Sequence, residues 1–381
     1  MFPFEQIGRY RDFQAFVSRD VMPEAERWDR EQKLPSALIA GMADRGYLGC
    51  SVPVDYGGQG WDTVTFGALN EAFGRGSSAL TGVLTVQAMV SSTLVKWGTP
   101  EQKRRLLPSL CNGNALGAFA LTEPGAGSAL RSLETRFSKK AGGGSLVLNG
   151  TKRWISCAQF AAFFLVFGRF EQRPIACVVP TERAGVHVEP IIDLMGFRAA
   201  GLAEIRFDDV EVPLDDVIGK PGFALSHVAP VGLHYGRIST ACSALGLMRG
   251  CLEESIAYAA ARTVGDKAVG EVGMIKTLLA RMGTDVEAAA ALCHGACRAD
   301  DEQVPEAYEK ALMAKYFTSV AAGRASSDAV QIRGASGCHA SSPVSRFYRD
   351  AKIMEIIEGT TQIHEKMLGE ILLQRARGQA H

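Results

Sequence analysis

The hydrophobic periodicity of this chain changes twice along its length, and this change constrains the fold more than any other feature. Residues 1–115 carry apolar side chains mostly at the three-to-four spacing of helices. Residues 116–222 change to alternation and short apolar runs, and residues 223–381 return to helical spacing. We therefore predict an α+β chain with an N-terminal helical domain, a middle β-sandwich or β-barrel domain, and a C-terminal helical domain.

Length and charge limit the class of protein. The 381 residues are enough for two to three domains, and 47% hydrophobic with 22% charged residues argues against disorder. The 41 Lys and Arg residues balance 41 Asp and Glu residues, so the formal net charge is zero. The chain therefore lacks the basic footprint of a nucleic-acid binder, and we expect no nucleic-acid partner.

Several helical segments can be placed individually. Apolar residues begin one segment at Phe13, Phe16 and Val17 and another at Leu38, Ile39 and Met42, and the Pro- and Gly-rich residues 52–60 predict a loop between helices. A helix begins at Pro100 with Thr99 as its N-cap. In the third stretch an apolar stripe and three later helices are predicted: Ile238, Ala241, Leu245, Met248, Leu252, Ile256 and Ala259 for the stripe, then Val272–Cys297, Ala307–Arg333 and Thr361–Leu373, with residues 298–302 as a polar connection.

The middle stretch reads as short strands. Four β-branched or aromatic runs, bounded by Gly, Asn, Asp or Pro, predict them: 145–149, 163–167, 175–179 and 203–207. Gly142-Gly143-Gly144 and Asn149-Gly150 predict turns between strands.

The cysteines and the N-terminus bear on compartment. Nine cysteines at irregular spacing, with no Cys-x-x-Cys, argue against a disulfide framework and suit a reducing cytosol. Cys293 and Cys297, around His294, are core-facing thiols at i, i+4 rather than metal ligands, so we expect no metal. No signal peptide and no run of about 18 uncharged apolar residues is visible, so we expect a cytoplasmic protein without a membrane span.

Three segments could carry chemistry. Phe119-Ala-Leu-Thr-Glu-Pro-Gly-Ala-Gly-Ser128 is an irregular loop that exposes backbone N–H groups, which can cradle a phosphate or a flavin edge; alone, it is more simply a surface turn. Trp154 and Ser156 alternate on a strand and would share a face, where they could stack on a planar heterocycle; the plainer alternative is a Trp packed under a helix. Glu358 lies at an apolar junction where its pKa could be raised for proton abstraction, although such a Glu usually serves helix electrostatics alone.

Together with further motifs, these segments resemble the acyl-CoA dehydrogenase family over nearly the whole chain. Seven matching segments occur in the family's order: Val54-Asp-Tyr-Gly-Gly58, Leu121–Ser128, Lys152–Ser156, Gly196-Phe-Arg198, Phe207–Pro213 with Gly219, Asp328–Ile332 with Gly334 and Gly337, and Arg349–Lys352 with Ile357-Glu-Gly-Thr360. The sequences of residues 196–201 and 351–359 most resemble those of acyl-carrier-protein dehydrogenases from polyketide extender-unit pathways. The resemblance implies a C-terminal four-helix bundle.

The resemblance also implies an activity. Members use FAD to oxidise the Cα–Cβ bond of an acyl thioester: a carboxylate removes the α-proton while the β-hydrogen passes as hydride to flavin N5. Glu358 matches the base, and its backbone N–H matches a donor that polarises the thioester carbonyl. Some relatives carry the base just before the Arg of the first C-terminal helix; Gly236 stands there, so Glu358 has no visible rival.

Further residues are implied to bind substrate and cofactor. Ser128, Arg237 and Gly359 would meet the acyl thioester. Phe119, Leu121, Thr122, Gly127, Ser128, Trp154, Ser156, Thr360 and Gln362 would meet FAD, as would Arg262, Gln331 and Gly334 from a neighbouring subunit. The implied partners are an acyl carrier protein or CoA carrying the acyl group, an electron-transfer flavoprotein or O2 as electron acceptor, and a second copy of the chain in a homodimer or homotetramer.

This sequence departs from the family pattern in several places. The Arg-x-x-Phe-Gly box reads Arg262-Thr-Val-Gly-Asp266, a Gln further on is Gly273, an acid after Gly-Ala-Gly-Ser is Ala129, and a Gly is Ala335. These changes fall on contacts to the FAD adenosine and to CoA. A flavin monooxygenase on the same scaffold and a non-catalytic flavin-binding subunit are the alternatives that remain.

Overall fold

The computed structural model describes residues 3–378. The first part of the chain is helical. Its α-helices are α1 (Tyr10–Phe16), α2 (Ala25–Glu31), α3 (Ser36–Asp44), α4 (Thr63–Gly76), α5 (Ser78–Trp97) and α6 (Pro100–Cys111). The predicted cap of α6 is confirmed: the Thr99 hydroxyl accepts the Gln102 N–H while the Gln102 side chain accepts the Thr99 N–H, which satisfies donors left free at a helix start.

The second part forms one connected sheet of seven strands. They are β1 (Gly117–Ala120), β2 (Arg136–Lys139), β3 (Ser145–Ile155), β4 (Phe163–Phe170), β5 (Arg173–Pro180), β6 (Val186–Pro190) and β7 (Ala203–Pro213). β4 pairs in parallel with β1 and, near its end, with β2, and it pairs in antiparallel fashion with β5. Side chains such as Leu148, Phe164 and Phe207 form a core of the sheet's own, so the predicted middle β domain is confirmed.

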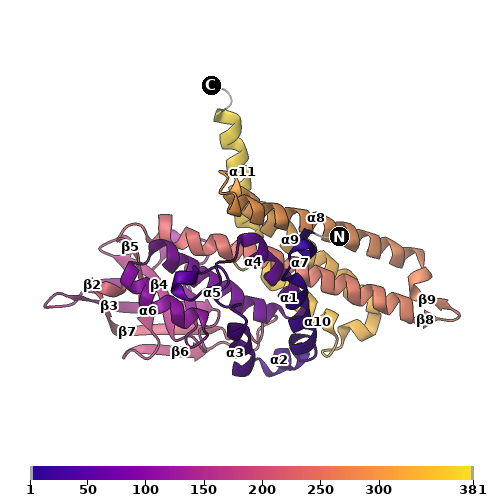
Figure 1. Ribbon diagram of the computed structural model, residues 1–381, viewed down its shortest axis with the longest axis horizontal. Helices are drawn as coiled ribbons and strands as arrows, with labels where there is room; N and C mark the ends of the chain where they lie inside the picture. The colour runs from indigo at the N-terminus through magenta and orange to yellow at the C-terminus, as the bar shows by residue number, and fades with distance from the viewer. Residues whose placement is uncertain (1–2, 379–381) are drawn as a thin grey trace.

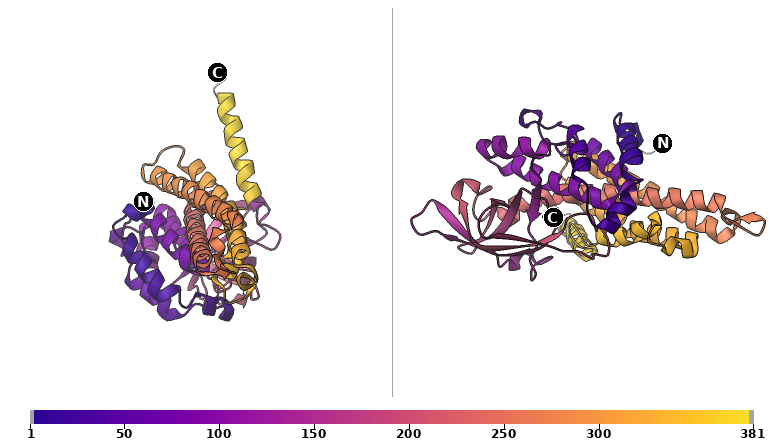
Figure 2. Two further views of the ribbon diagram at one scale, coloured as in Figure 1. Left: turned by 90° about the vertical axis from the view of Figure 1, so that its right-hand side faces the viewer. Right: turned by 90° about the horizontal axis from the view of Figure 1, so that it is seen from below.

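The third part is a bundle of long helices. They are α7 (Ala229–Ala261), α8 (Gly273–Asp301), α9 (Ala307–Arg333), α10 (Pro343–Met354) and α11 (Thr361–Gly378); a hairpin of β8 (Thr263–Val264) and β9 (Lys267–Ala268) joins α7 to α8. α7 to α10 pack on one another, and α4 and α5 pack on α7, so the two helical parts share one core. The sheet lies at one end of the molecule and the β8–β9 hairpin at the other, while α11 stands away from the body (Figure 1 and Figure 2).

Three local expectations were wrong. Asn149-Gly150 is not a turn but lies inside β3, where the β3–β7 register shifts at a bulge. Residues 298–301 continue α8 because their acids have partners there: Asp301 accepts the N–H groups of Thr63 and Val64 at the start of α4. The apolar stripe predicted on α7 is not a single buried face. Over much of its length α7 is buried on all sides by other helices, and Ile256, which belongs to the predicted stripe, is 49% exposed.

Helix α5 requires a separate remark about membranes. Within the described residues it is the one helix that is long and apolar enough to cross a membrane, contrary to our reading of the sequence, and 89% of its apolar window is buried inside the protein. Burial of this kind is what a core helix requires.

Candidate active site

A cavity of about 420 Å³ opens where α5, α7, the sheet and the α10–α11 turn meet. It is large enough to accept a ligand of cofactor or substrate size. Its lining includes most of the residues singled out from the sequence: Phe119, Leu121, Thr122, Gly127, Ser128, Trp154, Ser156, Arg237, Glu358, Gly359 and Thr360. Segments more than 200 residues apart in the chain therefore converge on one space.

The loop after β1 is held by a buried ion pair. The Lys152 ammonium, fully buried on β3, donates to a Glu123 carboxylate oxygen at 2.7 Å and to the Leu121 carbonyl at 3.0 Å. Glu123 also accepts the N–H groups of Glu134 and Thr135. Burial alone would raise the pKa of Glu123, but Lys152 and these N–H groups outweigh it and keep that pKa below its usual value. The pair thus fixes Leu121 and Thr122 at the cavity wall.

The end of β3 places Trp154 and Ser156 by a bulge and not by simple alternation. The β3–β7 register shifts between Lys152 and Ile155, and Trp154 has the left-handed φ of 62°. Trp154 is 49% exposed, whereas Ile155 is buried. Both Trp154 and Ser156 line the cavity, as expected for residues on one face, although a bulge beside Trp154 interrupts the regular pleat.

Glu358 lies on the turn between α10 and α11, with φ 54° followed by φ 100° at Gly359. Its Oε2 atom is buried and has no hydrogen-bond partner. A Cβ atom on Gly236 of α7 would lie 2.3 Å from Oε2, so the carboxyl occupies space that this glycine leaves open. Burial raises the pKa of Glu358 to about 7, although Arg237 and Lys315 act to lower it. A carboxyl of this kind can both take up and release a proton near neutral pH.

Cationic side chains from two helices hold the turn that carries Glu358. Arg237 of α7 donates from Nε to the Glu358 carbonyl at 3.4 Å, and its guanidinium lies over the Tyr308 ring. Lys315 of α9 donates to the Gly359 carbonyl at 2.7 Å. The turn's two adjacent carbonyls are therefore both tied back to the helical bundle.

Four predicted residues lie away from this cavity. Arg262, Gln331, Gly334 and Gln362 do not line it, and all four are exposed in the single chain. Arg262 follows α7 at the β8–β9 end of the bundle (Figure 1). Their predicted contacts with FAD, three of them from a neighbouring subunit, stay predictions. Within residues 3–378, no group of three or more His, Cys, Asp or Glu side chains could hold a metal ion.

Sequence reasoning missed two parts of the site. Helix α5 contributes Gly82, Thr85, Val86 and Met89 to the cavity wall, and these residues look like any buried helix face. Lys315 was also missed, although its spacing in the sequence could have indicated it. It follows Ala311 by four residues and Leu312 by three, so it lies on the same apolar helix face, where a charge requires a partner.

Comparisons with known proteins agree along the chain. Residues 7–114, 118–210 and 226–373 match the families described as the N-terminal, middle and C-terminal domains of acyl-CoA dehydrogenase. An acyl-CoA dehydrogenase of Bacillus subtilis (strain 168) is 34% identical over 375 residues, covering 97% of this chain and 98% of that protein. Butyryl-CoA dehydrogenase from Megasphaera elsdenii has a similar structure, with a TM-score of 0.92, 28% identity and coverage of 96% and 98% of the two chains.

Other similar structures bear on cofactor and substrate. A glutaryl-CoA dehydrogenase from Mycobacterium smegmatis in complex with FADH2 has a TM-score of 0.90 at 27% identity, with 96% and 94% of the chains covered. FkbI, for biosynthesis of the methoxymalonyl extender unit of a polyketide, has a TM-score of 0.88 at 30% identity (96% and 99% covered). The prolyl acyl carrier protein oxidase AnaB has a TM-score of 0.91 at 26% identity (97% and 98% covered). With three matching domains and this cavity between them, the chain belongs to the acyl-CoA dehydrogenase family of FAD-dependent oxidoreductases.

Proposed function

We propose that this protein oxidises the Cα–Cβ bond of an acyl thioester to a double bond, with Glu358 removing the α-proton. The observation that carries the proposal is the buried Glu358 carboxyl, which faces the cavity without a hydrogen bond to Oε2. A carboxylate that has no protein donor on one oxygen, and whose pKa burial raises to about 7, is a stronger base than an exposed one.

The cavity residues fit the ring system of FAD. Trp154 keeps about half of its surface exposed beside the cavity, so its ring is available to cover a flat ligand. Phe119 and Leu121 add apolar surface, and Thr122 and Ser156 bring polar groups to the same wall. A Cβ at Gly127 would meet only Thr122 Cγ2, at 4.0 Å, so the loop leaves room for a close ligand. Bound FAD supplies the acceptor for the β-hydride.

The backbone at Glu358 supports polarisation of the thioester carbonyl. Within the described residues, no acceptor is recorded for the Glu358 N–H, while the carbonyls of Glu358 and Gly359 are occupied by Arg237 and Lys315. A free N–H beside the base can donate to the oxygen on which negative charge grows as the α-proton leaves. Ser128, Arg237 and Gly359 line the space that the acyl thioester would occupy.

A carrier-protein thioester is the substrate class that we favour over CoA. Ala129 replaces an acid at the cavity loop, and FkbI and AnaB, two similar structures, are described in extender-unit biosynthesis and acyl-carrier-protein oxidation respectively. We extend the proposal to a cytoplasmic homodimer or homotetramer in which Arg262, Gln331 and Gly334 reach the FAD of a second copy and Gln362 reaches the FAD of its own chain. An electron-transfer flavoprotein or O2 would then reoxidise the flavin.

Flavin bleaching by acyl-pantetheine thioesters tests the proposal. The FAD-loaded protein and a Glu358→Gln variant are mixed without oxygen with a panel of these thioesters, and loss of flavin absorbance is followed. We expect Glu358→Gln to bleach at least about 1,000-fold more slowly, because the amide cannot accept the proton. Bleaching of the variant at the wild-type rate would exclude Glu358 as the base. A wild type that no thioester bleaches, and that forms peroxide or hydroxylated product in air, would favour a monooxygenase.

A further inference from the structure

Lys315 is a buried cation at the back of the active-site turn that the proposed chemistry does not use. Its side chain is fully buried within α9, and Nζ lies 2.7 Å from the Gly359 carbonyl oxygen. A buried ammonium is costly unless its charge is met, and burial accordingly lowers the pKa of Lys315 to about 7, a shift that Glu358 opposes. No carboxylate lies within ion-pair distance of it in the described residues, in contrast to Lys152, which is paired with Glu123.

The charged and titratable groups around Lys315 come from each element packed on it. Glu358 lies on the turn, Glu355 follows α10, Arg237 comes from α7 and His364 from α11. Glu355 is already paired with Lys352, and burial lowers the pKa of His364 to about 4, which leaves that ring neutral at pH 7. The edge of the His364 ring lies close to Gly359: a Cβ atom on Gly359 would be 3.0 Å from His364 Cε1. Glu358 is therefore the acid that acts electrostatically on Lys315 and has no ion pair of its own among the described residues.

We propose that Lys315 is a positioning residue for proton abstraction, which holds the Gly359 carbonyl so that the Glu358 carboxyl and N–H both face the cavity, and whose charge favours ionised Glu358. The inference rests on the proposed function of Glu358. The hydrogen bond restrains a turn with two consecutive positive φ angles, at Glu358 and Gly359, which isolated chains rarely adopt at a non-glycine residue.

The direction of the charge effect follows from the surroundings. Burial raises the pKa of Glu358, and Lys315 with Arg237 limits that rise. Because burial lowers the pKa of Lys315 to about 7, its charge is present mainly below that pH, and removal of this charge would raise the pKa of Glu358 further. Because the base must be ionised to accept the α-proton, the rate of flavin bleaching would then rise with pH around a higher midpoint.

The first experiment measures that midpoint with FAD-loaded Lys315→Met, Lys315→Arg and wild-type protein, using an acyl-pantetheine thioester from about pH 5 to about pH 9. The matched control is Lys310→Met, an exposed lysine on the same helix. We expect Lys315→Met to raise the midpoint by about one pH unit and to slow bleaching at pH 7 by about tenfold or more. Lys315→Arg keeps the charge and should keep the midpoint, as should Lys310→Met.

The second experiment is independent of turnover. Amide hydrogen exchange of the peptide that spans residues 355–362 should be about tenfold faster in Lys315→Met, because this variant loses one hydrogen bond from a charged donor. Exchange of the same peptide should be unchanged in Lys310→Met. Unchanged exchange, a wild-type midpoint in Lys315→Met, or an equal shift in Lys315→Arg would each overturn the proposal. If no thioester in the panel bleaches the wild-type flavin, the proposed function of Glu358 would instead be overturned. The exchange measurement alone would then decide the role of Lys315. If Lys315→Met does not fold, Lys315→Gln provides the same comparison.

Discussion

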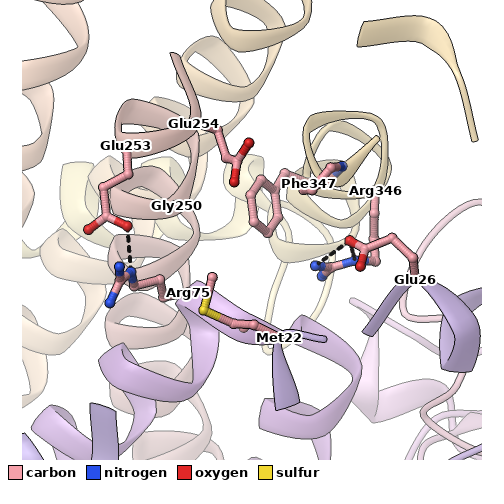
Figure 3. A pocket seen from close by; sticks show the side chains of 10 residues that line it. Met22, Glu26, Arg75, Gly250, Glu253, Glu254, Arg346 and Phe347 are labelled. Atoms are coloured by element: carbon pink, nitrogen blue, oxygen red, sulfur yellow. Dashed lines mark hydrogen bonds and ion pairs between the residues drawn. The ribbon is translucent and has the colours of Figure 1, made fainter. Parts of the chain in front are cut away.

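Acidic side chains line two regions of the molecule, and their charges have different partners in each. In the small hollow between α2, α4, α7 and α10, two acids meet arginines across the hollow: Glu26 meets Arg346, and Glu253 meets Arg75 (Figure 3). The third acid, Glu254, pairs with Arg333, which lies outside the lining of the hollow. In the active-site cavity the Glu358 carboxyl has no such partner, and Oε2 accepts no hydrogen bond. The paired acids therefore hold helices together, whereas the Glu358 carboxyl remains available to accept a proton.

The same contrast appears in shape. The paired hollow holds only about 40 Å³, whereas the cavity at Glu358 holds about 420 Å³. Side chains that satisfy one another close the space between them, and a side chain left unsatisfied requires room for a ligand that will complete it.

Removal of Arg346 should have the largest effect on stability. Its side chain is buried and lies 3.1 Å from Glu26 and 3.8 Å from Asp350. Its removal would leave Glu26 without this ion pair and Asp350, which is buried, with the Phe197 N–H as its remaining hydrogen-bond donor. We expect Arg346→Met to lower the free energy of unfolding by about 3 to 4 kcal/mol in urea titrations. Arg104→Met is the control, since the Arg104–Glu101 pair is exposed and should contribute less than about 1 kcal/mol. Equal losses in both variants would remove the distinction between the regions.

Glu358→Gln should change stability by a smaller amount and in the opposite direction. The folded-state pKa of about 7 lies above the ordinary value of 4.5, so folding takes up a proton between these pH values and wild-type stability falls as pH rises through them. The amide lacks this dependence. We expect the variant to match the wild type below pH 4.5 and to be more stable by about 3 kcal/mol above pH 7. Urea unfolding at several pH values measures the difference, and parallel curves would contradict it.

Glu253→Gln should have the smallest effect. Its partner Arg75 lies 2.5 Å away, but the Glu253 side chain is 48% exposed and the Arg75 side chain 24% exposed, so water screens the pair. We expect a loss of about 0.5 kcal/mol or less, declining further in high salt. A loss as large as that of Arg346→Met would show that exposure does not decide the value of a pair in this hollow.

Local sequence patterns predicted the helices and strands well where the pattern itself forms the structure. The predicted range Ala307–Arg333 is the range of α9, and Thr99 caps α6 as its side chain chemistry suggests. The errors arose where a distant segment decides the outcome. Asp301 stays helical because α4 offers N–H groups to its side chain, and Asn149-Gly150 stays in β3 because β7 continues beside it.

The site was predictable to the extent that its residues occur in recognisable segments. Trp154, Ser128 and Glu358 were found through ordered motifs, and the structure places all three on one cavity. Val86 and Met89 were not, since a residue that faces a cavity has the same spacing in the sequence as one that faces the core. The orphaned Oε2 of Glu358 is likewise a fact of packing that no spacing encodes.

The left-handed backbone at Glu358 has a consequence for how such a site can evolve. Glycine adopts a φ of 54° without the strain of a side chain, so replacement of Glu358 by glycine would relax the turn while removing the base. The space beside Gly236, which the carboxyl now fills, would then be empty and would face the same cavity from α7. An acid on α7 at that position could enter the vacated volume, so the fold allows its proton acceptor to move from a turn to a helix in two substitutions without rebuilding the cavity.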